Sequence, residues 1–200
     1  MRLHSSRSRR FKSIRNTLTA LVVAMSVSGC AIVAVTAVAV VGIDVARDRR
    51  GASTYWDDNK TERRLAGAID DQVKNENVSV TVYNGVTLLT GEVPDQRDID
   101  SIIDLAKADE GVRQVINRLE LAGSTNMTSR ANDSWLTTKV KTAIAASDAD
   151  STRIKVVTER ANVYLMGLVT PKEAEDAVNA TRTVTGVVRV IKVFEYIETT

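Results

Sequence analysis

The feature that most constrains the fold of this chain is an internal repeat. A Leu-x-Gly-x-Val pattern at residues 89–93 recurs at residues 165–169, an offset of 76 residues. Self-similarity at a fixed offset indicates one supersecondary unit that is present more than once. The chain of 200 residues therefore divides into two related parts, and each part must bury a core of its own.

Each copy contains a β-hairpin. In the first copy, residues 78–82 alternate between apolar and polar side chains, as a half-buried strand does, and residues 86–93 return. The Asn-Gly pair between these strands is typical of a tight hairpin turn. The second hairpin runs over residues 154–169 and turns at residues 160–162.

An amphipathic helix precedes and follows each hairpin, because apolar residues recur there at three- and four-residue spacing. These positions are Leu65, Ile69, Val73, Ile99, Ile102, Ile103, Ala106, Leu136, Val140, Ile144, Ala174, Ala177, Val178 and Thr181. Pro94 and Pro171 lie where the two later helices begin, a position that tolerates the missing N–H group. We expect these two helices to end at Gly111 and Gly186.

A third strand follows each of these glycines, over residues 112–121 and 187–197. Each copy therefore has the order α-β-β-α-β. Three strands with two helices on one face of the sheet can bury a small core. The predicted fold class is α+β, with two tandem domains, each a three-stranded mixed sheet with two helices packed on one face.

The first part of the chain has the pattern of an export signal. Residues 1–17 contain six lysines and arginines and no acidic residue, and the run over residues 17–43 is uncharged. Val27-Ser28-Gly29-Cys30 resembles the lipobox of bacterial lipoproteins, in which a peptidase cleaves before a cysteine whose sulfur has been acylated. We therefore expect a signal peptide over residues 1–29 and an acylated Cys30 that anchors the mature chain.

Two alternatives remain for this region. An uncleaved transmembrane helix needs about twenty apolar residues, and the run is longer than that. Alanine, valine, threonine and serine dominate the run, however, so it would be a weak membrane span. A free buried thiol is the second alternative. Ala31 follows the cysteine in place of the aspartate that lipoproteins use for inner-membrane retention, so the resemblance implies the outer membrane.

The mature chain is acidic and poor in catalytic residue types. From Cys30 onward it has 21 lysines and arginines against 25 acidic residues, which is unfavourable for general nucleic-acid binding. The one histidine, His4, lies in the signal region, so no imidazole remains for acid–base chemistry or metal binding. We expect no cofactor, no metal and no catalytic residue.

Composition also divides the chain. Residues 30–56 lack helical or strand periodicity and are expected to be a flexible tether. The first domain is expected over residues 57–121 and the second over residues 132–200. A short linker over residues 122–131 joins them.

Comparison of the two copies singles out one tryptophan. Asp58 aligns with Asp133, so Trp135 stands where the first copy has Lys60. At about 100° per residue, the apolar stripe of the helix that carries Trp135 is centred well over 100° away from it. Trp135 is therefore expected to face outward, beside Lys139. The alternative is that Trp135 packs against the first domain or the linker.

Charge differs between the two domains. Residues 57–121 contain 8 basic and 14 acidic residues, whereas residues 132–200 contain 9 of each. An anionic lipid surface should therefore repel the first domain and tolerate the second. An outward tryptophan beside a lysine also suits a bilayer interface, where indoles lie at headgroup level and cations meet phosphate.

The repeated Gly-x-Val at the end of the hairpin and the Gly-Val that opens the last strand resemble those of the BON-domain family. Residues 132–140 and 164–170 are similar to the dual BON-domain outer-membrane lipoproteins in particular. The resemblance implies a periplasm-facing lipoprotein that supports outer-membrane integrity and gathers at division sites. It also implies that the second domain binds anionic phospholipids such as phosphatidylglycerol and cardiolipin.

The same resemblance assigns lipid contact to the helix that carries Trp135. The expected phospholipid-binding residues are Trp135, Leu136, Thr138, Lys139 and Thr142. A different class of function is a periplasmic adaptor that binds envelope-assembly, cell-wall or division proteins, with Trp135 as the centre of a protein interface.

Overall fold

The computed structural model describes residues 48–73, 77–122 and 127–198. Cys30, the expected signal peptide and the expected tether up to residue 47 lie outside the described residues. Among the described helices, none combines the length and the apolar character that a membrane crossing requires.

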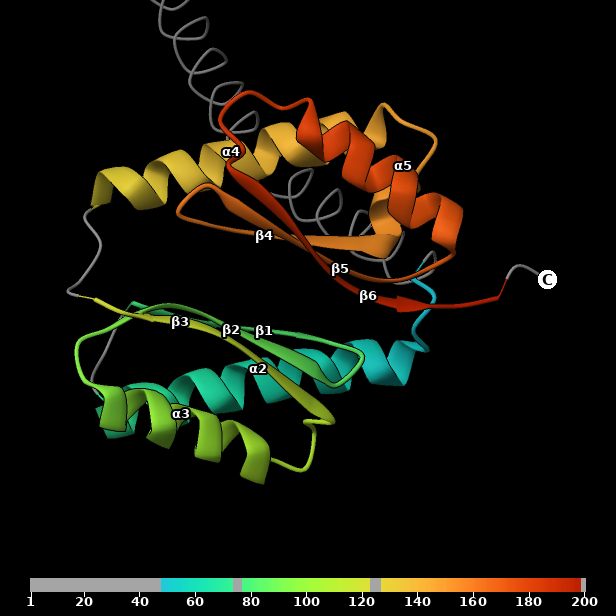
Figure 1. Cartoon of the computed structure of the whole chain (residues 1–200). Helices are drawn as coiled ribbons and strands as arrows, with labels where there is room; N and C mark the ends of the chain where they lie inside the picture. Colours follow the sequence, from blue (N-terminus) through green and yellow to red (C-terminus); the bar gives the residue numbers. More distant parts are fainter. Residues whose placement is uncertain (1–47, 74–76, 123–126, 199–200) are drawn as a thin grey trace, which may run out of the picture. The chain divides into compact units, whose positions relative to one another are not determined.

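The first domain is a three-stranded sheet with two helices on one face (Figure 1). Its elements are α2 (Ala52–Val73), β1 (Val78–Tyr83), β2 (Val86–Val93), α3 (Gln96–Ala108) and β3 (Gln114–Leu121). The strand order is β1-β2-β3. Since β1 is antiparallel to β2 and β3 is parallel to it, the sheet is mixed.

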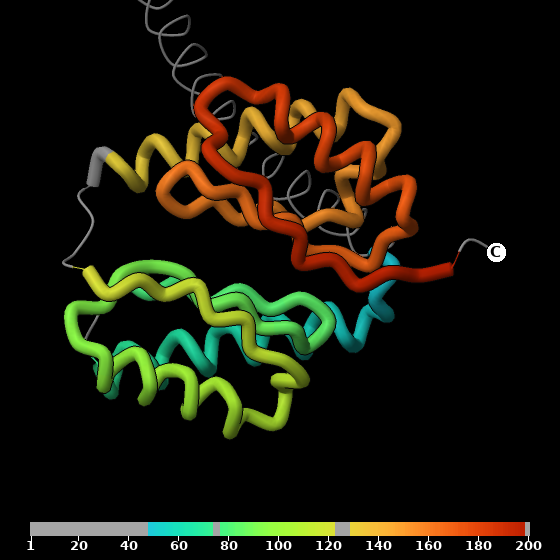
Figure 2. Tube along the Cα trace, viewed as in Figure 1, coloured from blue at the N-terminus to red at the C-terminus, as the bar shows by residue number. Residues whose placement is uncertain are grey.

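The second domain repeats this arrangement. Its elements are α4 (Met127–Ala145), a short 3-10 helix η1 (Ser151–Arg153), β4 (Ile154–Glu159), β5 (Asn162–Val169), α5 (Pro171–Arg182) and β6 (Arg189–Tyr196). The sheet has the order β4-β5-β6, again with one antiparallel and one parallel pair. The Cα trace follows the same course in both copies (Figure 2). The predicted α+β fold with two tandem α-β-β-α-β units is confirmed.

The Gly-x-Val pattern has a steric reason in each sheet. Gly91 has a φ of +119°, and a Cβ there would overlap the carbonyl oxygen of Asn77. A Cβ on Gly167 would lie 2.6 Å from the carbonyl oxygen of Arg153. Both glycines therefore allow the chain that enters the first strand of a hairpin to pass close to the end of its second strand.

A buried carboxylate joins the first helix of each domain to its hairpin turn. Asp58 accepts the N–H groups of residues 84 and 85, at 2.6 and 2.9 Å, and Asp133 accepts those of residues 160 and 161, at 2.8 and 2.9 Å. All four turn residues have positive φ, as hairpin turns of this type require. The sequence alignment of Asp58 with Asp133 is thus a structural equivalence.

Four expected boundaries differ from the structure. Helix α2 begins at Ala52, so the last five residues assigned to the flexible tether are helical, and α4 begins at Met127, within the expected linker. Gly111 and Gly186 do not end the helices: α3 is capped by Asp109 and α5 by Thr183, and both glycines lie in the following loops. A Cβ on Gly111 would overlap the buried hydroxyl of Thr61, so this glycine serves helix packing.

The outer faces of the two sheets share a third hydrophobic cluster. Its buried members are Tyr83, Val86, Leu88, Tyr164, Met166 and Val193. Ion pairs flank it, between Lys155 and Glu62 at 2.8 Å and between Arg113 and Glu195 at 2.7 Å. The residues that contribute to this cluster come from both domains, so the sheets pack on each other through the faces that the helices leave uncovered.

Residues 48–50, called here the strap, contact both domains just before α2. Arg49 donates two hydrogen bonds to the Glu173 carboxylate, at 2.6 and 2.9 Å. Arg50 is buried, pairs with Asp58 at 2.7 Å, and places its guanidinium 3.8 Å from the ring centroid of Tyr83. Burial raises the pKa of Tyr83 to about 12, so its hydroxyl stays neutral.

Candidate interaction surface on helix α4

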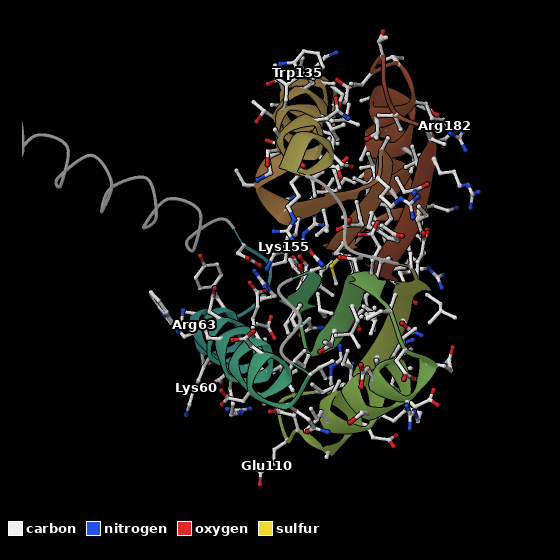
Figure 3. The ribbon with its side chains drawn as sticks, turned by 90° about the vertical axis from the view of Figure 1, so that its left-hand side faces the viewer. Lys60, Arg63, Glu110, Trp135, Lys155 and Arg182 are labelled. Carbon is white, nitrogen blue, oxygen red and sulfur yellow. The ribbon has the colours of Figure 1, made fainter. Side chains whose placement is uncertain are left out.

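Helix α4 buries one face in its own domain. Leu136, Val140 and Ile144 recur every four residues and are at most 1% exposed. Together with the hydrogen bonds of Asp133 to the hairpin turn, they fix the rotation of the helix. Trp135 consequently points away from the strands (Figure 3) and is 59% exposed. The predicted outward orientation of Trp135 is confirmed.

Lys139, one turn further on, lies against this tryptophan. Its ammonium nitrogen is 4.1 Å from the centroid of the Trp135 ring, which is a cation–π contact, and it donates a hydrogen bond of 3.2 Å to the carbonyl oxygen of Thr185. The indole and the positive charge therefore form one unit at the surface.

Two threonines extend this surface along the helix. Thr138 and Thr142 are exposed, and their hydroxyls donate to the carbonyl oxygens of Ser134 and Thr138, at 3.2 and 2.9 Å. Each hydroxyl proton is thus satisfied within the helix. A surface whose donors are already satisfied loses little when water is displaced from it.

Leu136 does not belong to this surface. It is 1% exposed and packs in the core of the second domain with Val140 and Ile144. A side chain in that position cannot contact a ligand outside the domain, so its inclusion among the lipid-binding residues was wrong. The name α4 surface is used below for Trp135, Thr138, Lys139 and Thr142.

Two acidic residues at the ends of α3 have structural roles. Asp95 caps the helix by accepting the N–H of Arg97, at 2.8 Å, and the side-chain hydrogen bond from Arg97 lowers the pKa of Asp95. Asp109 pairs with Arg64. Across residues 48–73, 77–122 and 127–198, no group of three or more histidine, cysteine or acidic side chains is placed to hold a metal ion.

Two features of the surface were not expected from the sequence. Trp56 on α2 is 57% exposed, although its position had been assigned to the tether. A shallow groove of about 490 Å³ also runs between α5 and β6, with Arg182 and Lys192 among its lining residues. The hydrophobic pattern gives no signal for the groove, but the presence of only two tryptophans in the chain could have drawn attention to Trp56.

Comparison with known proteins agrees with the fold. Residues 57–123 and 132–198 each match the model of the BON domain, and the chain belongs to the BON-domain family. With two such domains, it is a dual BON-domain protein similar to the outer membrane lipoprotein DolP of Haemophilus influenzae. The two are 37% identical over 174 residues, which cover 85% of this chain and 90% of that relative.

Two further relatives share less of their length. The 21 kDa hemolysin of Actinobacillus pleuropneumoniae is 36% identical over 155 residues, covering 76% of this chain and 80% of the hemolysin. The osmotically-inducible protein Y of Escherichia coli strain K12 is 28% identical over 127 residues, covering 61% of this chain and 63% of that protein.

Proposed function

We propose that this protein is a lipid-anchored lipoprotein of the outer membrane that faces the periplasm and binds anionic phospholipid through its α4 surface. The lipobox pattern at Cys30 and the similarity to the outer membrane lipoprotein of Haemophilus influenzae support the anchor and the location. The role is non-enzymatic: the protein maintains the integrity of the outer membrane, particularly at division sites.

The observation that carries lipid binding is the pairing of Trp135 with Lys139. An indole that is 59% exposed is costly in water, but it is favourable at the level of lipid headgroups. The ammonium group that lies 4.1 Å from its ring would then meet lipid phosphate, and each such cation contributes about 1 kcal/mol near an anionic surface.

The anchor allows this affinity to be weak. Acyl chains on Cys30 would contribute about 0.8 kcal/mol for each buried methylene, without preference for a headgroup. A tethered site experiences an effective concentration of lipid on the order of millimolar, so a low intrinsic affinity suffices. The anchor would select the membrane, and the α4 surface would select anionic regions within it.

Flotation with liposomes tests this proposal without the anchor. The chain from residue 31 onward, which contains every described element, is mixed with vesicles of phosphatidylcholine alone or with phosphatidylglycerol or cardiolipin. We expect flotation only with the anionic lipids. Trp135→Ala should weaken it at least about tenfold, because most of a tryptophan surface is lost from the contact, and Lys139→Gln about fivefold.

Lys141→Gln is the matched control. Lys141 is exposed on α4 and lies about 200° around the helix from Lys139, so its removal should leave flotation unchanged. Two results would favour a periplasmic adaptor that presents Trp135 to a protein partner. One is flotation that neither Trp135→Ala nor Lys139→Gln weakens, and the other is no flotation of the folded wild-type protein. The anchor is checked separately by mass spectrometry, and a mature chain that retains residues 1–29 would contradict it.

A further inference from the structure

The first domain carries an exposed tryptophan of its own. Trp56 on α2 is 57% exposed, close to the 59% of Trp135, so both tryptophans of the chain face outward. The ring of Tyr55 meets the Trp56 ring edge-on, with 5.5 Å between centroids and an interplanar angle of 89°. This contact restrains the indole but does not bury it.

Two unpaired cations share the helix face with Trp56. Lys60 and Arg63 follow it by four and seven residues, both are exposed, and both point away from the helix (Figure 3). Neither has an ion-pair partner among the described residues, whereas their neighbours Glu62 and Arg64 are paired with Lys155 and Asp109. On α4 a lysine, Lys139, likewise follows the exposed tryptophan by four residues, although there it contacts the Trp135 ring and the Thr185 carbonyl.

The internal repeat allows the positions of Trp56 and Trp135 to be compared on the first helix of each domain. Asp58 and Asp133 hold equivalent positions, and Trp56 precedes the first by two residues while Trp135 follows the second by two. At about 100° per residue, the two indoles differ by only about 40° around equivalent helices and by about one turn along them. Each domain thus presents an indole and a lysine on the corresponding side of its first helix.

The acidic charge of the first domain lies elsewhere. Asp100, Asp104 and Glu110 are exposed on α3 and the loop after it, and Asp70 and Asp71 lie at the far end of α2. Asp57 is also exposed, but it is about 100° around the helix from Trp56. Between Trp56 and Arg63, the exposed charged residues on the same stripe of α2 as Trp56 are therefore Lys60 and Arg63, and the next acidic residue on that stripe, Asp70, is seven residues beyond Arg63.

The position of this surface in the chain also matters. The strap precedes α2 directly, and α2 begins two residues after it, at Ala52. Trp56 lies in the second turn of that helix. Among the described residues, the α2 helix is thus the first element after the expected anchor, and tethering would raise the effective concentration of its exposed side chains at lipid.

We propose that Trp56, Lys60 and Arg63, called the α2 surface, form a second contact with an anionic lipid surface. This inference rests on the proposed function, because it requires that the protein works at a membrane. It adds a contact in the domain whose net charge opposes lipid binding. Together, the two helices would give each domain its own weak attachment.

Tryptophan quenching tests the α2 surface directly, because the chain has only two tryptophans. Trp135→Phe leaves Trp56 as the one indole, and Trp56→Phe leaves Trp135. Each acylated protein is reconstituted into vesicles that contain phosphatidylglycerol and phosphatidylcholine with brominated acyl chains. We expect bromolipid to quench Trp56 emission, with a shift of the emission to shorter wavelength relative to detergent-free protein without vesicles.

Charge variants in the Trp135→Phe background examine the cations. Lys60→Gln and Arg63→Gln should each reduce the membrane-bound fraction of Trp56 about fivefold. Lys107→Gln, which removes an exposed lysine of α3, is the control and should leave quenching unchanged.

The outcomes separate this inference from the proposed function. Quenching of Trp135 but not of Trp56 overturns the α2 surface and leaves the α4 surface intact. Quenching of neither overturns both. A Trp56 emission that is already shifted without vesicles and is insensitive to bromolipid means that the chain before residue 48 covers this indole, which also overturns the inference.

Discussion

At the scale of single residues, the sequence pattern identified some glycines as important, but only the structure gives the reason for each. The repeated Gly-x-Val pattern identified the repeat, and the structure supplies the reason: Gly91 is in a left-handed conformation beside the Asn77 carbonyl. Gly67, in contrast, lies inside α2, and a methyl group added to it would have no neighbouring atom within 4 Å. The two glycines should therefore respond in opposite directions to the same substitution.

We expect Gly91→Ala to lower the free energy of unfolding by about 3 kcal/mol, because it combines a strained φ with steric overlap. Gly67→Ala should raise it by about 0.5–1 kcal/mol, since alanine is the better helix former. Urea denaturation followed by circular dichroism measures both. A neutral Gly91→Ala would mean that the strand end moves away from Asn77 at little cost.

Among the residues of the candidate site, the sequence placed Trp135 correctly and Leu136 wrongly. The outward position of Trp135 followed from helical geometry alone, because Val140 and Ile144 define the buried stripe so clearly. Leu136 was placed on the surface through the family resemblance, against the periodicity that put it in the core. Helix geometry was the more reliable guide to which side chains can reach a ligand.

At the scale of elements, the hairpins were predicted closely, whereas the start of α2 and the ends of α3 and α5 were not. Strand β2 has the predicted bounds, and β1 extends one residue further than expected, to Tyr83. Residues 52–56 lack an apolar stripe, so periodicity could not reveal their helix. That end of α2 is held instead by the buried pair of Arg50 and Asp58.

Helix α5 begins with a capping box. Its glutamate, Glu173, also accepts two hydrogen bonds from Arg49 of the strap. Thr170 accepts the N–H of Glu173, and Glu173 accepts the N–H of Thr170, at 3.3 and 2.8 Å. Partial burial alone would raise the pKa of Glu173, but the hydrogen bonds from Arg49 and Thr170 outweigh it and lower the pKa to about 2. Ionised Glu173 therefore stabilises the fold above its ordinary pKa, and this contribution is lost as the pH falls toward 2.

Glu173→Gln should reduce the free energy of unfolding at pH 7 by about 1 kcal/mol or more, because half of the capping box and both hydrogen bonds from Arg49 are weakened. It should also flatten the loss of stability of the wild type between about pH 4.5 and 2. Denaturation across this pH range measures both effects. Glu175→Gln, which changes an exposed carboxylate of the same helix, should do neither.

At the scale of the whole described region, the sequence predicted two domains but not their packing. The missed signal is the continuous apolar run over residues 163–166; in the structure β5 is buried from Val163 to Gly167, and β2 is buried along its entire length. A strand that lies on one helical layer should alternate between buried and exposed side chains, and continuous burial means that both faces are covered. Pairing of the two sheets could have been inferred from that, but not its register.

This packing predicts cooperative unfolding. The wild type should show one thermal transition, because neither sheet can expose the third cluster without cost. Met166→Glu places a charge at a position that is 0% exposed in that cluster, and it should separate the melting of the two domains into two transitions. Val188→Glu, at a position that is 70% exposed, is the control and should leave one transition. Scanning calorimetry measures the number of thermal transitions, and two transitions in the wild type would contradict the expectation.

The strap has a mechanical consequence for the proposed anchor at Cys30. Tension applied through that anchor would enter the described chain at residue 48 and would pass through Arg49 to Glu173 in the second domain and through Arg50 to Asp58 in the first. Because two ion pairs in parallel would share this force, we expect α2 to stay packed on its sheet. We expect the fold to carry tension from its anchor as one body, with the two domains loaded together rather than in sequence.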